Sequence, residues 1–288
     1  MRHACLTTLA IACLAIATTA RAASAPPAAE PWKTTPLPAP PPKPVEEGVV
    51  EVGGAKIWWG SFGAGEPVIL LHGGAGNSEH WSNQIVALAE KYRVVVIDSR
   101  GHGRSTRDPK QAFSYHLMAT DVLAVMDKLK IDQASFVGWS DGGVIGLDLA
   151  INNPTRVKKL FAFGANYNLS GMKGGGPHAT FATYFDKCAG DYQRLSATPK
   201  DYKAFQAALG KMWKVEPNFK KEQLAAIKAA TVVADGEHDE IIRQDHVREM
   251  AKIIPGAKLV LIPEASHFAL WQQPEAFNKA LFELLDAK

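Results

Sequence analysis

The hydrophobic positions of this chain form short, continuous apolar runs separated by stretches with a helical repeat. The clearest runs are residues 67–71 and 94–97, and residues 134–137 and 157–163 are two further predicted strands, the second of which contains Lys158 and Lys159. Residues 115–129 place apolar side chains on one helical face. Fully apolar strands are typical of a parallel sheet that is covered on both faces. Strands that alternate with helices therefore predict an α/β fold with a doubly wound, mostly parallel sheet.

Two segments break this alternation. Residues 23–47 are rich in proline, which predicts an extended, polyproline-like leader that is either a spacer or an arm over the domain. Between about residues 165 and 230 the pattern becomes mostly helical. Gly53 and Gly54 separate two short apolar stretches and predict a hairpin near the start of the folded part. We therefore expect one folded domain at residues 48–288 with a helical insertion.

Residues 1–22 have the pattern of a secretory signal peptide, in which a short positive start precedes an alanine-rich apolar run and a small-x-small cleavage site. The apolar run of about 16 residues is shorter than the ~20 that a membrane-spanning helix requires. We therefore expect an exported protein, periplasmic or secreted, with no membrane span in the mature chain. Cys188 is then the one remaining cysteine, and we expect it to be a packed residue without an internal disulfide.

The overall composition disfavours two other classes of function. The formal net charge is +3, and it falls closer to zero when Arg2 and Arg21 are removed with the signal peptide. This balance disfavours a surface dedicated to nucleic acid. The sequence also lacks the HExxH pattern of zinc hydrolases and the GxxxxGK pattern of nucleotide-binding loops, so we expect neither a metal nor a cofactor.

The strongest chemical signal is the turn at residues 138–143, which has the sequence GWSDGG. It follows the apolar run 134–137 and leads into an apolar helical stretch, so its GxSxG pattern stands between a strand and a helix. Gly138 and Gly142 allow a sharp reversal that strains the residue between them. Ser140 is therefore expected to stand exposed at a helix N-terminus, where backbone N–H groups can bind a developing oxyanion.

A serine in such a turn is a weak nucleophile until a base removes its proton, so the residues downstream test the hypothesis. Asp239 lies just past the end of an apolar strand, and it is our candidate for the acid of a catalytic triad. Asp235 and Glu237 in the same segment are its rivals. His267 lies in the loop after the last apolar strand, at residues 258–262, and is our candidate for the base.

Two features of this arrangement resemble a known family. Ser140, Asp239 and His267 follow one another in the order that α/β-hydrolases use. Residues 98–105 match the pattern D-x-R-G-x-G-x-S, which resembles a loop of the same family. Over residues 48–288 the chain therefore resembles an α/β-hydrolase-fold serine hydrolase.

The resemblance implies a role for each of these residues. Ser140 is expected to be the nucleophile, His267 the general base, and Asp239 the acid that orients the imidazole. The backbone N–H groups of Gly74 and Asp141 are expected to form the oxyanion hole, in which each donor contributes about 3 to 4 kcal/mol to the transition state. No cofactor is implied by this chemistry.

The resemblance also bears on the insertion and on the other histidines. In the family, an insertion at the place of residues 165–230 forms a cap over the active site, so we expect its aromatic side chains to form the cap core and the pocket wall. Among the nine histidines of the chain, His72 and His102 belong to motifs that resemble structural parts of the family. We expect the remaining histidines, apart from His267, at the surface.

Trp139 and Asp141 of the turn are candidates for substrate contact. The turn resembles that of the biphenyl-hydrolase-like, valacyclovirase-type members, in which the corresponding acid suits α-amino-acid esters. Asp141 could then attract a substrate ammonium group. A carboxylate at a helix start is also favoured by the helix dipole alone, by about 0.3 to 1 kcal/mol, so both interpretations stay open.

Together these observations predict an exported, carboxylesterase-like serine hydrolase that cleaves a small carboxylic ester through an acyl-enzyme, with amino-acid esters as one possible class of substrate. The same scaffold also supports C–C bond hydrolases, lactonases, thioesterases and amidases, so the fold does not decide the reaction. A non-catalytic binding protein on the same scaffold is a remote alternative. We expect a small-molecule substrate and no nucleic-acid partner.

Overall fold

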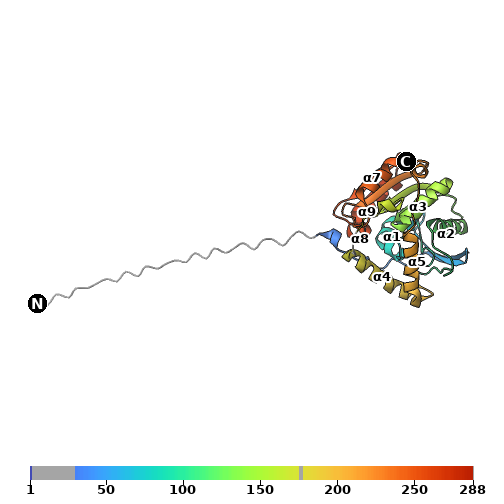
Figure 1. The fold of residues 1–288 in the computed structure, drawn as a ribbon, viewed down its shortest axis with the longest axis horizontal. Coiled ribbons are helices and arrows are strands. Elements are labelled where there is room, and N and C mark those ends of the chain that lie inside the picture. The colour runs from blue at the N-terminus through green and yellow to red at the C-terminus, as the bar shows by residue number, and fades with distance from the viewer. Residues whose placement is uncertain (2–29, 175–177, 288) are drawn as a thin grey trace.

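The computed structural model describes Met1 and residues 30–174 and 178–287 (Figure 1). Except for Met1, the predicted signal peptide at residues 1–22 lies outside the described residues, and so does the first part of the leader. None of the helices in these ranges is long and apolar enough to cross a membrane.

An eight-stranded sheet forms the centre of the fold, with the strand order β1-β2-β4-β3-β5-β6-β7-β8. The first two pairs, β1 with β2 and β2 with β4, are antiparallel, and all other pairs are parallel. The sheet is thus mostly parallel, as the apolar pattern predicts. The strands are Glu46–Val52 (β1), Ala55–Phe62 (β2), Pro67–Leu71 (β3), Arg93–Ile97 (β4), Ala134–Trp139 (β5), Val157–Phe163 (β6), Ala230–Gly236 (β7) and Lys258–Ile262 (β8).

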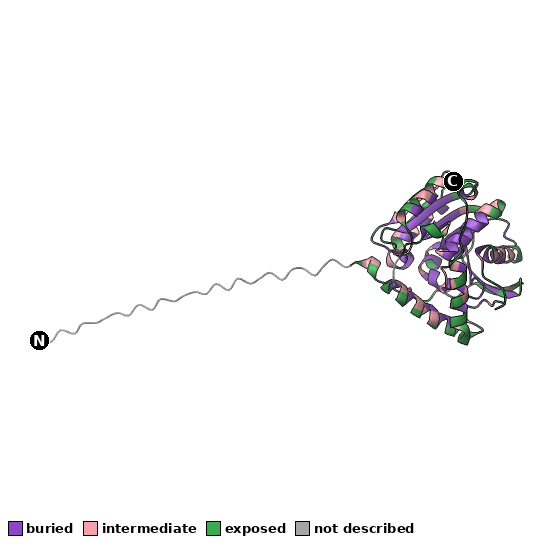
Figure 2. Ribbon diagram, viewed as in Figure 1, coloured by how far each residue is buried: buried purple, intermediate pink, exposed green. Residues whose placement is uncertain are grey.

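The most apolar strands occupy the middle of this sheet, where helices cover both faces. In the register of the sheet, Phe136 of β5 lies between Ile69 of β3 and Leu160 of β6, and all three side chains are fully buried. Figure 2 shows the buried residues concentrated in the interior of the domain. At the edge, Gly53 and Gly54 both have positive φ, which closes the predicted hairpin between β1 and β2.

Helices pack against the sheet and against one another. Helix α3 packs on β3, β5 and β6 and also on α2, while α9 packs on α1 and on β6, β7 and β8. The helices are Ser82–Leu88 (α1), Tyr115–Lys128 (α2), Asp141–Asn152 (α3), Ala179–Leu195 (α4), Tyr202–Trp213 (α5), Lys221–Ala225 (α6), Gln244–Ile253 (α7), Ala269–Gln272 (α8) and Pro274–Leu285 (α9).

The segment between β6 and β7 contains α4, α5 and α6, and α4 and α5 lie together at one end of the molecule (Figure 1). The sequence pattern suggested a last helix over residues 219–229, but α6 is only Lys221–Ala225. The chain leaves the helix early because Ile227 and Ala229 are buried where it turns into β7. Tertiary packing thus overrides the local helical pattern there.

The described part of the proline-rich leader lies against the folded domain. A short 3-10 helix at Pro31–Lys33 brings the Trp32 ring onto His238, with 4.0 Å between the ring centroids. The amide nitrogen of Gln272 in α8 donates to the carbonyl oxygen of Thr34 at 2.6 Å. The hydroxyl of Thr35 donates to the carbonyl oxygen of Thr180 in α4 at 3.3 Å. The leader therefore contacts both the insertion and the sheet domain.

Candidate active site

Ser140 occupies a strained turn between β5 and α3. Its φ is 55° and its ψ is −119°, a conformation that non-glycine residues rarely adopt and that is common at functional sites. The turn requires small neighbours, because a Cβ atom on Gly138 would lie 2.2 Å from the carbonyl oxygen of Gly142. A Cβ atom on Gly142 would lie 1.9 Å from the carbonyl oxygen of Leu71. Close backbone contact therefore explains the glycines around Ser140.

His267 and Asp239 form a buried pair in the loops after β8 and β7. Nδ1 of His267 lies 2.6 Å from Oδ2 of Asp239. The other carboxylate oxygen accepts the backbone N–H groups of Ile241 and Ile242, both at 2.7 Å, which fixes the orientation of the acid. Because Nδ1 faces a carboxylate, it carries the proton and Nε2 is left as the basic nitrogen. Within the described ranges, Nε2 of His267 is buried and has no hydrogen-bond partner.

The surroundings of this pair favour a charged imidazole. Burial alone would lower the pKa of His267, but the charge and the hydrogen bond of Asp239 outweigh it, and the pKa is raised above 6.5. The charges of Glu240 and Asp141 add to this effect. Burial would likewise raise the pKa of Asp239, but the charge of His267 and the hydrogen bonds keep it below its ordinary value. The pair can therefore accept a proton at Nε2 and stabilise the imidazolium that results.

The geometry distinguishes Asp239 from its two rivals. Glu237 is exposed to solvent. Asp235 is fully buried, but its oxygens accept the backbone N–H of Gly236 and the amide of Gln244, at 2.9 and 3.0 Å. Asp239 is the acid that contacts the imidazole.

Ser140, His267, Gly74 and Asp141 all line one pocket of about 230 Å³. The Gly74 loop approaches the turn closely, because a Cβ atom on Gly73 would lie 3.4 Å from Cβ of Ser140. The hydroxyl of Tyr184 in α4 donates to the carbonyl oxygen of Gly74 at 2.8 Å and holds the loop. The backbone N–H of Asp141 is at the start of α3, where a helix offers no internal acceptor. The predicted oxyanion donors thus belong to the same pocket as the serine.

Asp141 has side-chain partners that the sequence did not indicate. Its carboxylate is buried, and Oδ1 accepts the hydroxyl of Tyr115 at 2.8 Å while Oδ2 accepts the indole N–H of Trp213 at 2.9 Å. Both donors are neutral. Burial raises the pKa of Asp141, although the hydrogen bonds of Trp213 and Tyr115 and the charge of His267 oppose this shift. Tyr115 opens α2 and Trp213 ends α5, so no local sequence signal joins them to Asp141.

The pocket wall is largely apolar, and its charged groups are mostly acids. Glu216 is the second carboxylate of the lining, and its Oε2 accepts the backbone N–H of Tyr115 at 2.9 Å. Among the described residues that line the pocket, no lysine or arginine is present. The insertion supplies much of the apolar wall, through Leu169, Met172, Phe181, Tyr184, Phe185 and Trp213.

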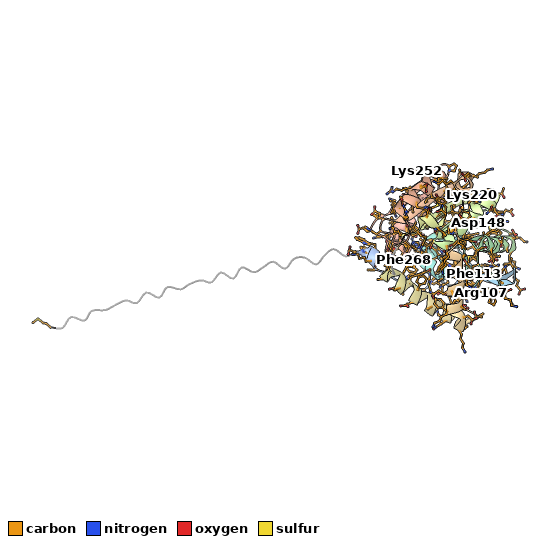
Figure 3. The ribbon with its side chains drawn as sticks, in the orientation of Figure 1. Arg107, Phe113, Asp148, Lys220, Lys252 and Phe268 are labelled. Carbon is orange, nitrogen blue, oxygen red and sulfur yellow. The ribbon has the colours of Figure 1, made fainter. Side chains whose placement is uncertain are left out.

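Trp139 lines the pocket and also supports the histidine loop. Its indole N–H donates to the carbonyl oxygen of His267 at 2.9 Å, and its ring packs edge-on against Phe268, which is labelled in Figure 3.

Asp235, Asp239 and His267 are the one cluster of three possible metal ligands within the described ranges. Nδ1 of His267 and Oδ2 of Asp239 are hydrogen-bonded to each other, so these two atoms are not available as metal ligands.

Several other expectations can be compared with the structure. Cys188 in α4 is buried, and burial raises the pKa of its thiol, so it is a packed residue. Two histidines that we expected at the surface, His80 and His246, are buried instead. His80 packs beneath α4, and His246 stacks on Tyr167 with 4.3 Å between ring centroids. Both corrections result from contacts between segments far apart in the sequence.

Comparison with known proteins agrees with this geometry. The family model described as alpha/beta hydrolase fold matches residues 66–190. A solved structure of Est816, described as an N-acyl homoserine lactone degrading enzyme, is 31% identical with a TM-score of 0.65, covering 82% of this chain and 99% of that chain. The chain belongs to the α/β-hydrolase family.

This α/β-hydrolase is also similar to curated enzymes. It is 28% identical to a 2-hydroxy-6-oxononadienedioate/2-hydroxy-6-oxononatrienedioate hydrolase of Comamonas testosteroni, over 80% of this chain and 91% of the relative. It is 28% identical to the putative carbamate hydrolase RutD of Caulobacter sp. (strain K31), over 77% of this chain and 91% of the relative. These relatives are named as hydrolases of different substrates, and this chain is a hydrolase of the α/β-hydrolase fold.

Proposed function

We propose that this hydrolase is an exported, carboxylesterase-like serine hydrolase that cleaves small carboxylic esters through an acyl-enzyme. Ser140 attacks the ester carbonyl, and His267 takes its proton at Nε2 and returns it to the leaving alcohol. Asp239 orients His267, while the N–H groups of Gly74 and Asp141 bind the oxyanion. Water then cleaves the acyl-enzyme by the same route. Export rests on the sequence of residues 1–22 alone.

One observation carries this proposal. Nδ1 of His267 lies 2.6 Å from Oδ2 of Asp239 and its Nε2 has no hydrogen-bond partner in the described part of the chain. His267 and Ser140, in its strained turn, line the same pocket. A nucleophile, a base and an orienting acid are therefore available in one small apolar pocket. This is the set of groups that acyl transfer requires.

The charges of the pocket favour neutral or cationic esters over anionic substrates. The Comamonas testosteroni relative is named for a dioate substrate, which carries negative charge, and such a substrate needs cationic partners. Asp141 and Glu216 line this pocket, and no lysine or arginine is among its described lining residues. Asp141 is buried between two neutral donors, so a substrate ammonium group would supply the missing counter-charge. We therefore propose α-amino-acid esters as the favoured substrates.

Lactone hydrolysis is the second candidate. It is supported by the 31% identity to Est816, which spans nearly the whole of that chain. A lactone is an internal ester, so Ser140, His267 and Asp239 would act on it in the same order. The two candidates differ only in whether the leaving alcohol remains attached to the acyl group.

The first experiment compares p-nitrophenyl acetate, an α-amino-acid p-nitrophenyl ester and an N-acyl homoserine lactone as substrates of the protein that lacks residues 1–22. We expect ester turnover that Ser140→Ala abolishes. Asp141→Asn should lower kcat/KM for the amino-acid ester about 10- to 100-fold and for the acetate by less than about threefold, since a hydrogen bond to a charged group contributes roughly 1.5 to 3 kcal/mol.

Asp148→Asn is the matched control, because Asp148 is a buried carboxylate on the same helix and does not line the active-site pocket. It should leave the substrate preference unchanged. Activity that survives in Ser140→Ala would refute the serine mechanism. A lactone rate well above the ester rates would favour the second candidate, and equal effects of Asp141→Asn on both esters would refute ammonium recognition.

A further inference from the structure

Asp235 is a buried carboxyl group that the proposed reaction does not use. It stands next to the last residue of β7 and is fully inaccessible to solvent. Oδ1 accepts the backbone N–H of Gly236 at 2.9 Å, and Oδ2 accepts the side-chain amide of Gln244 at 3.0 Å. Both donors are neutral. Within the described part of the chain, Asp235 forms no salt bridge with a lysine or an arginine.

The neighbours of Asp235 make a second negative charge unfavourable. Side-chain atoms of Asp235, Asp239 and His267 lie within 4.8 Å of one another. Asp239 has the imidazole and two backbone N–H groups to stabilise its charge, whereas Asp235 has only neutral donors. Two carboxyl groups so close in a buried space do not both ionise, and the one with weaker stabilisation keeps its proton. That group is Asp235.

The other charged groups around the pair do not change this assignment. The charge of the Lys173 ammonium opposes the raised pKa of Asp235, but the ammonium donates its hydrogen bond to the backbone carbonyl of Asp239. Glu240 accepts the backbone N–H of His267 at 3.0 Å, which adds negative charge to the same region. Gln244, at the start of α7, is neutral. The surroundings therefore favour a neutral Asp235.

We propose that Asp235 is a protonated positioning residue, whose O–H donates a hydrogen bond to the Asp239 carboxylate and holds it in place for His267. This inference rests on one part of the proposed function, namely that Asp239 orients the imidazole of His267. Facing atoms of the two carboxyl groups lie within 4.8 Å of each other, and burial and the charge of Asp239 raise the pKa of Asp235 well above its ordinary value. Asp235 thus fixes the rotamer of Asp239 from β7.

Backbone contacts around Asp235 hold it in place beside Asp239. A Cβ atom on Gly236 would lie 2.3 Å from the carbonyl oxygen of Ser266, so the β7 loop is pressed against the loop of His267. The amide of Gln244 donates both to Asp235 and to the carbonyl oxygen of Gly236, at 3.0 and 2.9 Å. Three segments therefore meet at Asp235, and a group that donates from this point can hold Asp239 rigidly.

The first test compares Asp235→Ala with Asp235→Asn. The alanine variant removes the donor, and we expect kcat to fall about 10- to 100-fold, because Asp239 loses a hydrogen bond to its charged carboxylate, with KM within about twofold. The asparagine amide keeps the shape and an N–H donor and cannot ionise, so it should recover kcat to within about threefold of the unmodified enzyme. The acid limb of its pH profile should stay in place.

Asp148→Asn is the matched control and should alter neither kcat nor the pH profile. Asp148, which is labelled in Figure 3, is a buried carboxylate that does not line the active-site pocket. Equal losses of kcat in Asp235→Ala and Asp235→Asn would overturn the donor role. A shift of the acid limb of Asp235→Asn by about one pH unit to lower pH would also overturn it. That shift would mean that the unmodified enzyme carries a negative charge at Asp235 next to His267.

A second test needs no substrate, so it separates this inference from the proposed reaction and also applies if Asp235→Ala does not fold. A carboxyl group whose pKa is raised by folding makes the fold less stable as the pH rises above the pKa of the unfolded group, about 3.9. Asp235→Asn lacks this effect. The melting temperature of Asp235→Asn, measured against that of the unmodified protein, should therefore rise steadily from pH 4 to pH 8. A difference that is constant or falls with pH would show an ionised Asp235.

Discussion

Two buried histidine–aspartate pairs lie in the described part of this protein, and the pKa values of their histidines shift in opposite directions. His267 and Asp239 meet in the loops after β8 and β7, with 2.6 Å between Nδ1 and Oδ2. His80 and Asp191 meet between the 3-10 helix Ser78–Trp81 and helix α4, with 3.1 Å between Nε2 and Oδ2. The pKa of His267 is raised above 6.5, whereas the pKa of His80 is lowered below it.

The difference arises from what surrounds each carboxylate. Burial lowers the pKa of both histidines, and in each pair the aspartate opposes this. Around His267 the further charges, Glu240 and Asp141, are negative. Asp191 instead shares its charge with Lys187 and Arg194, at 3.1 and 3.0 Å, and the Lys187 charge disfavours a charged His80. Burial therefore outweighs Asp191 at His80, where Lys187 adds to the lowering of the pKa and the charge of Glu79 opposes it.

The second pair has a structural role. Asp191 belongs to the insertion and also accepts the amide of Asn77 at 3.1 Å, so it connects α4 to the loop that follows β3. The carbonyl of His80 accepts the indole N–H of Trp271 at 2.8 Å. We infer that the His80 pair attaches the insertion to the sheet domain, while the His267 pair serves the reaction.

The largest expected contrast is between Asp239→Asn and Asp191→Asn. Asp239→Asn should lower kcat about 10⁴-fold, because the imidazole loses its orienting acid. Asp191→Asn should keep kcat within about tenfold but lower the free energy of unfolding by about 3 kcal/mol, because it leaves Lys187 and His80 without their buried partner. Ester turnover and urea denaturation of both variants provide the measurement. Similar losses of kcat in the two variants would contradict the separation of roles.

The next contrast is in pH dependence. Since the pKa of His267 is raised, kcat/KM should rise with pH through a midpoint above 6.5, where the base becomes neutral. The pKa of His80 is lowered by folding, so near pH 6.5 His80 binds a proton in the unfolded chain but not in the folded one. His80 therefore reduces the free energy of unfolding as the pH falls below 6.5. The melting-temperature advantage of the unmodified protein over His80→Gln should therefore shrink from pH 7 to pH 5. An advantage that grows on acidification would contradict this reasoning.

The smallest expected effect is that of Lys187→Met. Removing the cation beside Asp191 should raise the pKa of His80 by roughly half a unit while kcat stays within about twofold. Lys200→Met, which changes an exposed lysine, is the control. NMR titration of the His80 ring would measure the shift. An unchanged pKa of His80 would mean that the competing cation does not distinguish the two pairs.

The sequence was informative about the parts of the fold that depend on local pattern. Continuous apolar runs indicated the central strands, and the register of β3, β5 and β6 confirms a parallel sheet. The glycine pattern around Ser140 indicated a sharp turn, and the φ of 55° at Ser140 agrees with it. The order of Ser140, Asp239 and His267 indicated the α/β-hydrolase family. These signals are readable because strand periodicity and glycine requirements act over a few residues.

Tertiary structure alone decided the features that depend on contacts between distant segments. The partners of Asp141, Tyr115 and Trp213, come from α2 and α5 and carry no motif. The burial of His80 and the early end of α6 were likewise not readable, because each depends on packing against elements far along the chain. The direction of a pKa shift is decided in the same way, since it depends on charges a few ångströms away in space rather than on neighbours in sequence.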